Sequence, residues 1–595
     1  MKRMLAAGVA GLSLAAAGAA SANNVWTQGA STAFSQCDGF GMPSSGGDGM
    51  TGYAMIWGIF NPPGYGTTAK SGQSDGAAGV LACDAALADT EHLKPAYWMR
   101  KVNLLRARAL HQLEQDAVDA ALKDLDLAYA AVQDPNDPFY ARSLGLGLDL
   151  VKAYALRRAG KADEGLALAR TAWSKRPYSR LAGYSAIVAL GASAEEAEGL
   201  PVMRSLARLQ PSLLNDLFLT ALANGRWEEV VALFPQQSTP KQRHRIGAGA
   251  YAREFSTTDR ASGEVFWASR AGAYAYALAS LGRAQEARAV LAAARARVAQ
   301  SAAPEAAPPP PPPKSTATRS QLRKAKQAKE AHERHERDSA RISKQGGGAI
   351  DLWAELVEQR LMIDEGKADQ VFKALSEKAP PRGPLGAELV RALAAKTPAS
   401  DKTTLAALDA MKAKVEVTPK KRPEPDVSTL FRSLPDAETV KRIAPYKKKT
   451  TNIWTGGEDG FTVKPGESPP DWEAPTEGVI SVSFRGASSP AGVVEEMALL
   501  RAAELALEKG VKGFVILDRQ DVEHTVSTTQ YGAVLRTDPA GYSTELDVLF
   551  VDPANLPAKY RGAAWRVIDA DAVFASLGPI YIRPEADKPE KAKKK

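Results

Sequence analysis

The sequence predicts a multidomain protein with an all-α array of paired helices, followed by disordered Pro/Lys-rich linkers and a small α+β C-terminal domain. The first observation is an Ala- and Leu-rich stretch over 85–300, which short Gly, Asp-Pro and Gly-Lys turns divide. The second is a pair of stretches rich in proline and lysine, a composition that does not build a packed core. The third is an alternation of apolar and polar residues beyond residue 472, which is the period of a half-buried strand.

Changes in composition divide the 595 residues into segments, and a chain of this length has room for about two to four domains. We predict a signal peptide over 1–22, a Gly- and aromatic-rich segment over 23–84, helical repeats over 85–300, a Pro-rich and basic linker over 301–348, additional helices over 349–413, a Pro/Lys-rich linker over 414–471, an α+β domain over 472–584 and a basic tail over 585–595.

The N-terminus has the three parts of a secretory signal. Two basic residues precede an apolar run over 4–19, and small residues close it at Ala22. This order predicts cleavage between Ala22 and Asn23 and a periplasmic or secreted protein, with association to the outer membrane as a variant of this expectation. A membrane anchor is the alternative, which the short run and its small closing residues disfavour. No later run approaches the roughly 18 apolar residues of a spanning helix, so no transmembrane helix is expected after signal removal.

Export bears on the two cysteines, Cys37 and Cys83. In an oxidising compartment a lone pair of cysteines usually forms a disulfide, and we predict one here. Two unrelated buried thiols are the alternative. Between them, the apolar island over 53–60 is expected to dock on the first helices, and an aromatic lip for a ligand is the other interpretation.

Four sections of the array share one pattern: a first helix with small or apolar residues, a turn residue, and a second helix with small or apolar residues, alanine in most sections. In the clearest section the turn is Gly160, and Ala169 and Ala172 follow it. Small residues let two antiparallel helices pack closely, and glycine ends the first helix in a conformation that other residues resist. The turn residues of the four sections are Asp116, Gly160, Gly225 and Gly282.

With its glycine turn, its paired alanines and Pro177 at the close, this pattern resembles the tetratricopeptide repeat, although the turn residues are unequally spaced and the family period is roughly 34 residues. The resemblance implies a concave groove, lined by the first helix of each pair, that binds a protein or an extended peptide. Arginine and tyrosine there suit an acidic or extended segment. The residues that the repeat pattern directs into this groove are Arg106, Tyr154, Arg157, Arg158, Asn215 and Tyr276.

The linkers carry most of the excess positive charge, which is +8 for the whole chain. Six prolines over 308–313 predict a stiff polyproline II arm, and the charged stretch over 321–343 has no apolar face, so it is either a solvated helix or disordered. The Gly triplet over 346–348 is expected to end it. Basic clusters over 314–344, 420–449 and 588–595 suit an anionic envelope surface. They lack the interleaved aromatic residues of a single-strand nucleic-acid platform, so no nucleic-acid partner is predicted.

The C-terminal part predicts strand, helix, strand and further strands, which is a small α+β domain. Alternation over 480–484 and 544–551 indicates half-buried strands, and the apolar run over 514–517 indicates a buried one. A helix is expected from Ser489-Pro490 to Gly510, with Glu495 and Glu496 favoured by the positive end of its dipole.

Stretches of this domain over 482–486, 499–505 and 513–519 resemble a family of small bacterial envelope lipoproteins of unknown function. The chain lacks the lipid-bearing cysteine and the short length of that family. The resemblance therefore implies an envelope location but no lipid anchor.

We find no Gly-x-Ser-x-Gly elbow and no phosphate loop ending in Gly-Lys-Ser/Thr, so we predict a non-enzymatic protein without cofactor or metal. The best catalytic candidate is a cluster after the buried strand formed by Asp518, Asp521, Glu523 and His524. A carboxylate beside a histidine can tune its pKa, but a polar turn that leaves a core strand explains the cluster more simply.

Three hypotheses follow. The first is an exported protein-binding scaffold or adaptor of the bacterial envelope. The second is an envelope hydrolase or processing enzyme with a site near Asp518 and His524. The third is a structural tether whose basic arms bind anionic cell wall or outer membrane.

Overall fold

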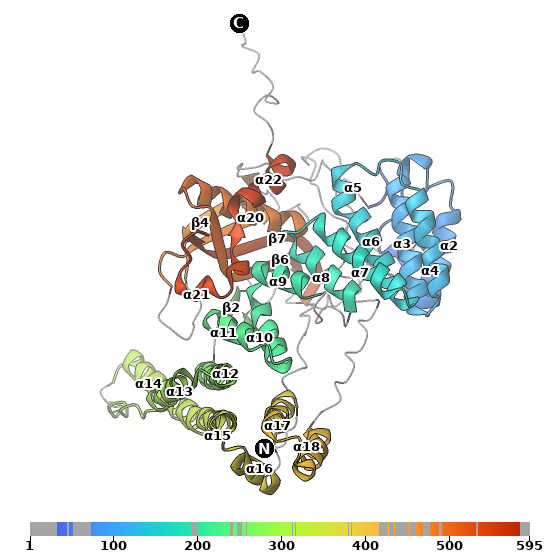
Figure 1. The fold of residues 1–595 in the computed structure, drawn as a ribbon. Coiled ribbons are helices and arrows are strands. Elements are labelled where there is room, and N and C mark those ends of the chain that lie inside the picture. Colours follow the sequence, from blue (N-terminus) through green and yellow to red (C-terminus); the bar gives the residue numbers. More distant parts are fainter. Residues whose placement is uncertain are drawn as a thin grey trace.

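The computed structural model describes most of the chain, shown as a ribbon in Figure 1. The described residues are 32–44, 47–50, 73–191, 199–237, 242–246, 253–257, 259–311, 313, 315, 317–378, 380–381, 383–415, 427, 434, 450–451, 458–467, 476–486, 491–530 and 533–582. The predicted signal peptide with its cleavage point at Ala22 and Asn23, the apolar island over 53–60, nearly all of the 420–449 cluster and the basic tail lie outside these residues.

The described chain is mostly helical and ends in a small antiparallel sheet. The helices of the N-terminal part are α1 (Ala33–Asp38), α2 (Gly76–Ala88), α3 (Trp98–Glu114), α4 (Val118–Ala130), α5 (Pro138–Arg142), α6 (Leu144–Arg158), α7 (Ala162–Ser174), α8 (Arg180–Leu190), α9 (Leu200–Leu209), α10 (Leu214–Ala223), α11 (Trp227–Leu233), α12 (Arg260–Ser280) and α13 (Ala284–Ser301). A short antiparallel hairpin of β1 (Gln242–Ile246) and β2 (Arg253–Thr257) lies between α11 and α12.

The predicted helix pairs are present as α3/α4, α6/α7, α10/α11 and α12/α13. Each first helix ends two residues before the expected turn residue, where φ is positive: 59° at Asp116, 81° at Gly160, 66° at Gly225 and 75° at Gly282. Alanines of the second helices, such as Ala169 and Ala287, are fully buried or nearly so. The sequence therefore predicted the local pairing correctly, because both the turn and the close packing depend on residues within one pair.

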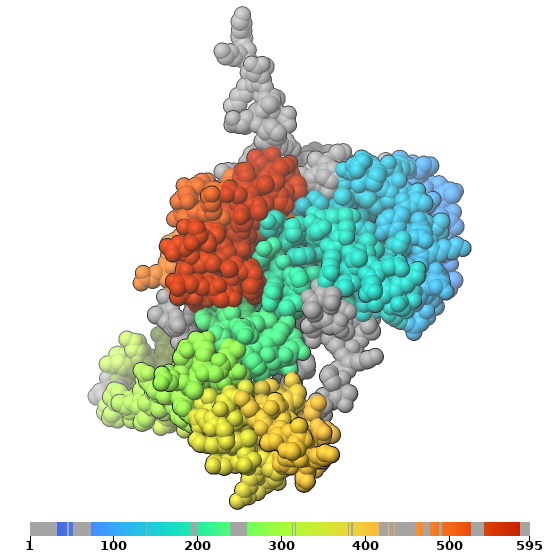
Figure 2. Space-filling view, in the orientation of Figure 1, coloured from blue at the N-terminus to red at the C-terminus, as the bar shows by residue number. Residues whose placement is uncertain are grey.

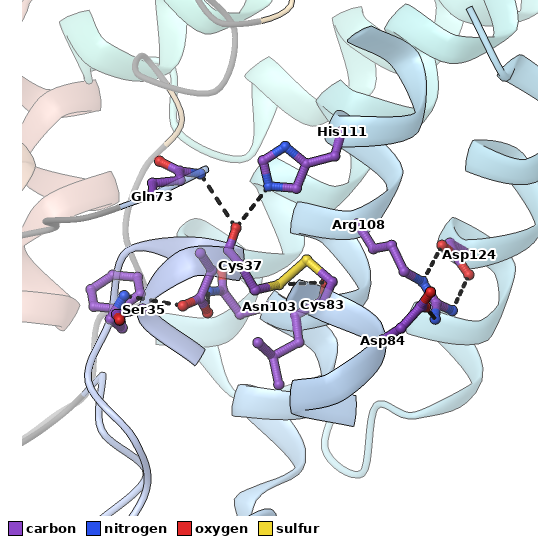
Figure 3. Close-up of a disulfide and its surroundings, with 12 residues drawn as sticks. Ser35, Cys37, Gln73, Cys83, Asp84, Asn103, Arg108, His111 and Asp124 are labelled. Carbon is purple, nitrogen blue, oxygen red and sulfur yellow. Dashed lines mark hydrogen bonds and ion pairs between the residues drawn. A yellow bond between two sulfur atoms is a disulfide. The ribbon is translucent and has the colours of Figure 1, made fainter. Parts of the chain in front are cut away.

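The expected disulfide is also present. Cys37 and Cys83 join α1 to α2 with an S–S distance of 2.03 Å, and neither side chain is exposed. His111 of α3 lies with Nε2 2.8 Å from the carbonyl oxygen of Cys37, so α1, α2 and α3 meet at this bond (Figure 3).

The basic stretch after the prolines is the helix α14 (Arg319–Arg341), which a capping box at Thr318 begins. The sequence suggested that the Gly triplet over 346–348 ends this stretch, but the helical backbone continues through the triplet. A π-helical turn (Ile342–Gly346) connects α14 directly to α15 (Gly347–Asp364), because Ile342 and Gly346 are packed in the core and hold the backbone helical. The chain continues with α16 (Ala368–Glu377), α17 (Pro384–Lys396) and α18 (Lys402–Val415).

Helices α12 and α15 cross closely at Gly272. A Cβ atom at this position would lie 2.1 Å from Cγ of Trp353, and neither backbone can move without disturbing the core. We expect Gly272→Ala to lower the free energy of unfolding by about 1–3 kcal/mol through overpacking, despite the better helix propensity of alanine. Urea unfolding measures this. The matched control is Gly348→Ala in α15, where nothing lies within 4 Å of the new Cβ, and a gain of up to about 1 kcal/mol is expected there.

The C-terminal sheet has the order β3-β4-β5-β7-β6-β8, and all neighbours are antiparallel. Its strands are β3 (Thr450–Thr451), β4 (Glu458–Pro465), β5 (Ile480–Gly486), β6 (Gly513–Gln530), β7 (Ala533–Val551) and β8 (Ile568–Asp569). Helices α20 (Ala491–Glu508) and α22 (Ala570–Tyr581) pack together in its core, and the short α21 (Ala558–Arg561) follows β7. The predicted succession of elements is confirmed, but β4 begins before the expected boundary at 472.

In the described structure this domain is docked on the helices, whereas the sequence suggested only that it follows disordered linkers. Leu209 of α9 belongs to the core of the sheet domain, and Trp565 after α21 packs on the core of the helices. In Figure 2 the orange and red domain lies directly against the teal and green helices. Among the described residues, no helix has both the length and the apolar character that crossing a membrane requires.

Candidate functional site

The junction between the helices and the sheet domain contains a buried set of charges. Glu496 of α20 is completely buried, and its carboxylate accepts hydrogen bonds from Arg142 at 2.7 Å and from Arg176 Nε at 3.0 Å. The hydroxyl of Tyr581 in α22 donates a third at 2.5 Å. The sequence suggested that this acid would merely suit the start of a helix. It instead joins α5 and the segment after α7 to the C-terminal domain.

The neighbouring Glu495 extends the set. It accepts hydrogen bonds from the Ser179 hydroxyl at 2.6 Å and from Arg519 Nη2 at 2.6 Å. Arg519 of β6 also donates to Asp521, and Arg180 at the start of α8 lies 3.2 Å from that carboxylate. Since Arg519 and Glu495 are each 2% exposed, this ion pair within the C-terminal domain is closed to a substrate, and Ser179 and Arg180 connect it to the helices.

The guanidinium groups dominate the electrostatics of this set. Burial alone would raise the pKa of Glu496, but Arg176 and Arg142 outweigh it and lower the pKa from 4.5 to about 2. Burial would likewise raise the pKa of Asp521, and Arg519 and Arg180 hold it well below its usual range. Both carboxylates therefore remain charged at neutral pH and keep the arginines neutralised.

These lowered pKa values predict that the free energy of unfolding decreases as the pH falls into the acid range. A carboxyl with a lowered folded pKa stabilises the fold fully above its unfolded value of 4.5, and this contribution is lost as the pH falls toward about 2. For Glu496 we expect a loss of about 2 kcal/mol between pH 5 and pH 3. Urea unfolding at a series of pH values measures it, and Glu496→Gln should remove this part of the dependence. If the difference in the free energy of unfolding between the wild type and Glu496→Gln does not change with pH, the lowered pKa of Glu496 is contradicted.

The junction also contains a cavity beside this network of charges. A cavity of about 320 Å³ lies between α9 and the segment after α21. Its lining residues are Pro201, Arg204, Ser205, Arg208, Trp565 and Val567. The four residues from α9 follow the spacing i, i+3, i+4, i+7, so they share one face of that helix. The opposite face of α9 is buried through Val202, Met203, Leu206 and Leu209.

The cavity has more positive than negative charge. Arg204 lies over the indole of Trp565, 6.0 Å from the ring centroid, and shares the carboxylate of Glu229 with Arg226. Arg208 lies 5.9 Å from the ring of Tyr178 and has no ion pair with any described residue. Burial lowers the pKa of Arg208. Two guanidinium groups, those of Arg204 and Arg208, thus line the cavity without a carboxylate in its lining, an arrangement suited to an anionic ligand.

The residues predicted to line a groove are differently placed. Arg106, Tyr154 and Tyr276 are 4%, 1% and 0% exposed, so they are part of the packed interior and cannot line an open surface. Tyr276 donates a hydrogen bond to Glu388 of α17. The prediction was wrong for these three, and for Tyr276 the reason is α17, which packs on the face that the repeat pattern leaves open.

One residue of the predicted linker, Leu434, adds to this covering. Leu434 is 5% exposed and belongs to the helical core, and a Cβ at Gly147 of α6 would lie 3.7 Å from its Cδ2. A Cβ at Gly147 would also lie 2.3 Å from Nη1 of Arg106, so Leu434 lies close to the side chain that was expected to face a ligand.

The other three residues that were predicted to line the groove are half-buried, and each already forms a hydrogen bond or an ion pair within the chain. Arg157 donates to the carbonyl oxygen of Ala189 at 2.6 Å. Arg158 pairs with Asp116, and Asn215 accepts a hydrogen bond from Arg270 at 2.5 Å. These side chains connect neighbouring helices.

The cluster around Asp518 does not form a turn, because β6 continues to Gln530. Asp521 is bound to Arg519 and Arg180, whereas Nε2 of His524 lies 2.8 Å from the hydroxyl of Ser543. The carboxylate and the imidazole thus have separate partners. In the described part of the chain, no three His, Cys, Asp or Glu side chains are placed to hold a metal.

The α9 face was not predicted from the sequence. Its polar residues at helical spacing are visible in the sequence, but an exposed polar stripe is the usual state of a surface helix. What makes it a site is Trp565, which lies 357 residues beyond Arg208 and which only the docked domain brings near. No sequence pattern of one helix contains that information.

Comparison of the chain with protein-family models, curated proteins and solved structures gives no match. The geometry of the junction is therefore the basis for assigning a function.

Proposed function

We propose that the chain is an exported, non-enzymatic scaffold of the bacterial envelope that binds a protein partner at the junction of its two domains. In this proposal tetratricopeptide-like helix pairs form the frame, and the docked sheet domain completes the binding site. The observation that carries it is the arginine-rich cavity between α9 and Trp565. The signal-like N-terminus and the Cys37–Cys83 disulfide support export.

The place of the cavity fits a scaffold. Ligand sites often lie where two domains meet, because two rigid surfaces can offer groups that neither holds alone. Here α9 supplies charge and the C-terminal domain supplies an aromatic ring. The buried ion pair of Glu496 with Arg176 and the hydrogen bond from Ser179 to Glu495 hold the two surfaces in register, so the site is formed before a partner arrives.

Site-specific photocross-linking in cells tests the proposal. Benzoylphenylalanine replaces Pro201, an exposed residue on the cavity rim, in the full chain. The matched control replaces Leu81 of α2, which is 70% exposed and lies far from the junction. We expect a discrete adduct with an envelope protein from position 201 and none from position 81. The absence of any protein adduct at 201, or identical adducts at both positions, would refute a scaffold that binds here.

A second candidate is the tether to an anionic surface, which α14 favours. Its N-terminal half carries five basic residues and no acid before Glu330, and these side chains are exposed. They are Arg319, Arg323, Lys324, Lys326 and Lys329. Salt-sensitive sedimentation of the full chain with anionic vesicles tests this role, and a variant with all five changed to glutamine should remain in the supernatant.

A further inference from the structure

We propose that the cavity between α9 and Trp565 binds the carboxylate of an acidic side chain in an extended protein segment, with an adjacent apolar side chain against the indole. This inference rests on the proposed function and specifies what its partner presents. It names a ligand class and the residues that select it: Arg204 and Arg208 for charge, and Trp565 for shape.

The hydrogen-bonding groups of the cavity have unused capacity. Arg204 uses Nε and Nη2 on Glu229, and its Nη1 makes no hydrogen bond to the described part of the chain. Nε of Arg208 is buried and has no hydrogen-bond partner among the described residues. A buried N–H group without an acceptor is costly, so a carboxylate that accepts a hydrogen bond from Nε of Arg208 would remove that cost.

The arrangement of these groups suits a planar anion. Arg204 and Arg208 are four residues apart, one turn of α9, and Ser205 lies on the same face between them. Two guanidinium groups at this spacing can each donate to one carboxylate, and the hydroxyl adds a third donor.

The rest of the cavity wall is apolar, which explains why we expect an apolar side chain next to the acidic one. Trp565, Val567 and Pro201 lie opposite or beside the arginines. The cavity of about 320 Å³ is at the small end of ligand sites, which span roughly 300–1,000 Å³. That volume accommodates one or two side chains of a peptide and is too small for a lipid headgroup with several sugars, so a protein segment is the favoured source of the anion.

Fluorine NMR of the full chain labelled with 5-fluorotryptophan provides the readout. The resonance of Trp565 is assigned by its loss in Trp565→Phe. The probes are acetyl-Leu-Glu-Leu-amide and its neutral isostere acetyl-Leu-Gln-Leu-amide. We expect the glutamate peptide to shift the Trp565 resonance saturably, with an affinity at least about tenfold above that of the glutamine peptide, since hydrogen bonds to charged groups are the stronger class.

Two variants locate the binding. Arg208→Gln removes a cation that forms no ion pair with the described residues, so the fold should persist while the peptide affinity falls about tenfold or more. Ser205→Phe fills the cavity without changing its charge and should abolish the shift. The matched control is Arg295→Gln on the exposed side of α13, which should bind like the wild type.

The outcomes separate this inference from the proposed function. If position 201 cross-links a protein but Arg208→Gln binds it equally well, the scaffold stands and the carboxylate site is refuted. Equal shifts with the two peptides also refute it. Inorganic phosphate or lipid A vesicles that shift Trp565 when the glutamate peptide does not would overturn the inference in favour of a phosphate ligand.

Discussion

Glu496→Gln is expected to destabilise the docked C-terminal domain by about 3–5 kcal/mol, the largest effect of any single substitution that we predict. Glutamine has nearly the same shape and can still accept the hydrogen bond from Tyr581, so packing is preserved. What is lost is the negative charge between Arg142 and Arg176. Arg176 is 1% exposed and cannot turn to solvent, so it remains buried without a counter-charge. Urea unfolding with fluorescence and hydrogen exchange of β6 measures the loss.

The control separates buried from exposed ion pairs. Glu286 pairs with Arg283 at 2.6 Å on the surface of α13, where solvent and salt screen the pair. Glu286→Gln should have no more than a marginal effect on unfolding. A double variant, Arg176→Met with Glu496→Met, replaces the buried pair by apolar groups and should recover part of the stability lost in Glu496→Gln. Equal small effects of Glu286→Gln and Glu496→Gln would show that the junction does not depend on this charge.

Local features of the fold were predictable because their causes lie close together in the sequence. The turns at Gly160 and Gly282 require left-handed backbone, and the alanines that follow them permit close helix packing. In β7, Thr544, Leu546 and Val548 are buried while the residues between them are partly exposed, which is the two-residue period of a half-buried strand. Each of these signals concerns neighbours along the chain.

The junction was not predictable, because its partners are far apart in the sequence. Arg142 and Glu496 are 354 residues apart, and Ser179 and Glu495 are 316 apart. Two adjacent glutamates near the start of a helix are already explained by the helix dipole. This local explanation gives no reason to expect ion pairs with residues that are distant in the sequence. The same reasoning applies to the predicted groove: the repeat pattern orients Tyr276 correctly as a first-helix residue but cannot show that α17 covers it.

Removal of the disulfide through the double substitution Cys37→Ala and Cys83→Ala is expected to lower the stability of the N-terminal helices by about 4 kcal/mol. The bond closes a loop with a sequence separation of 46, and the chain-entropy model gives this magnitude for a loop of that size. The effect acts mainly on the unfolded chain, which gains freedom when the loop opens. Hydrogen exchange of α3 amides and urea unfolding of the oxidised wild type and the variant measure it.

The native structure around the bond should survive the substitution, which distinguishes this entropic effect from a loss of packing. Asp38 of α1 remains paired with Arg100 at 2.9 Å, with both side chains buried, and accepts a further hydrogen bond from Asn103 at 2.6 Å. These contacts hold α1 on α3 without the sulfur atoms. We therefore expect an unchanged circular dichroism spectrum together with a lower urea midpoint. A stability within about 1 kcal/mol of the oxidised protein would show that the unfolded N-terminal region is already compact and that the bond constrains it little.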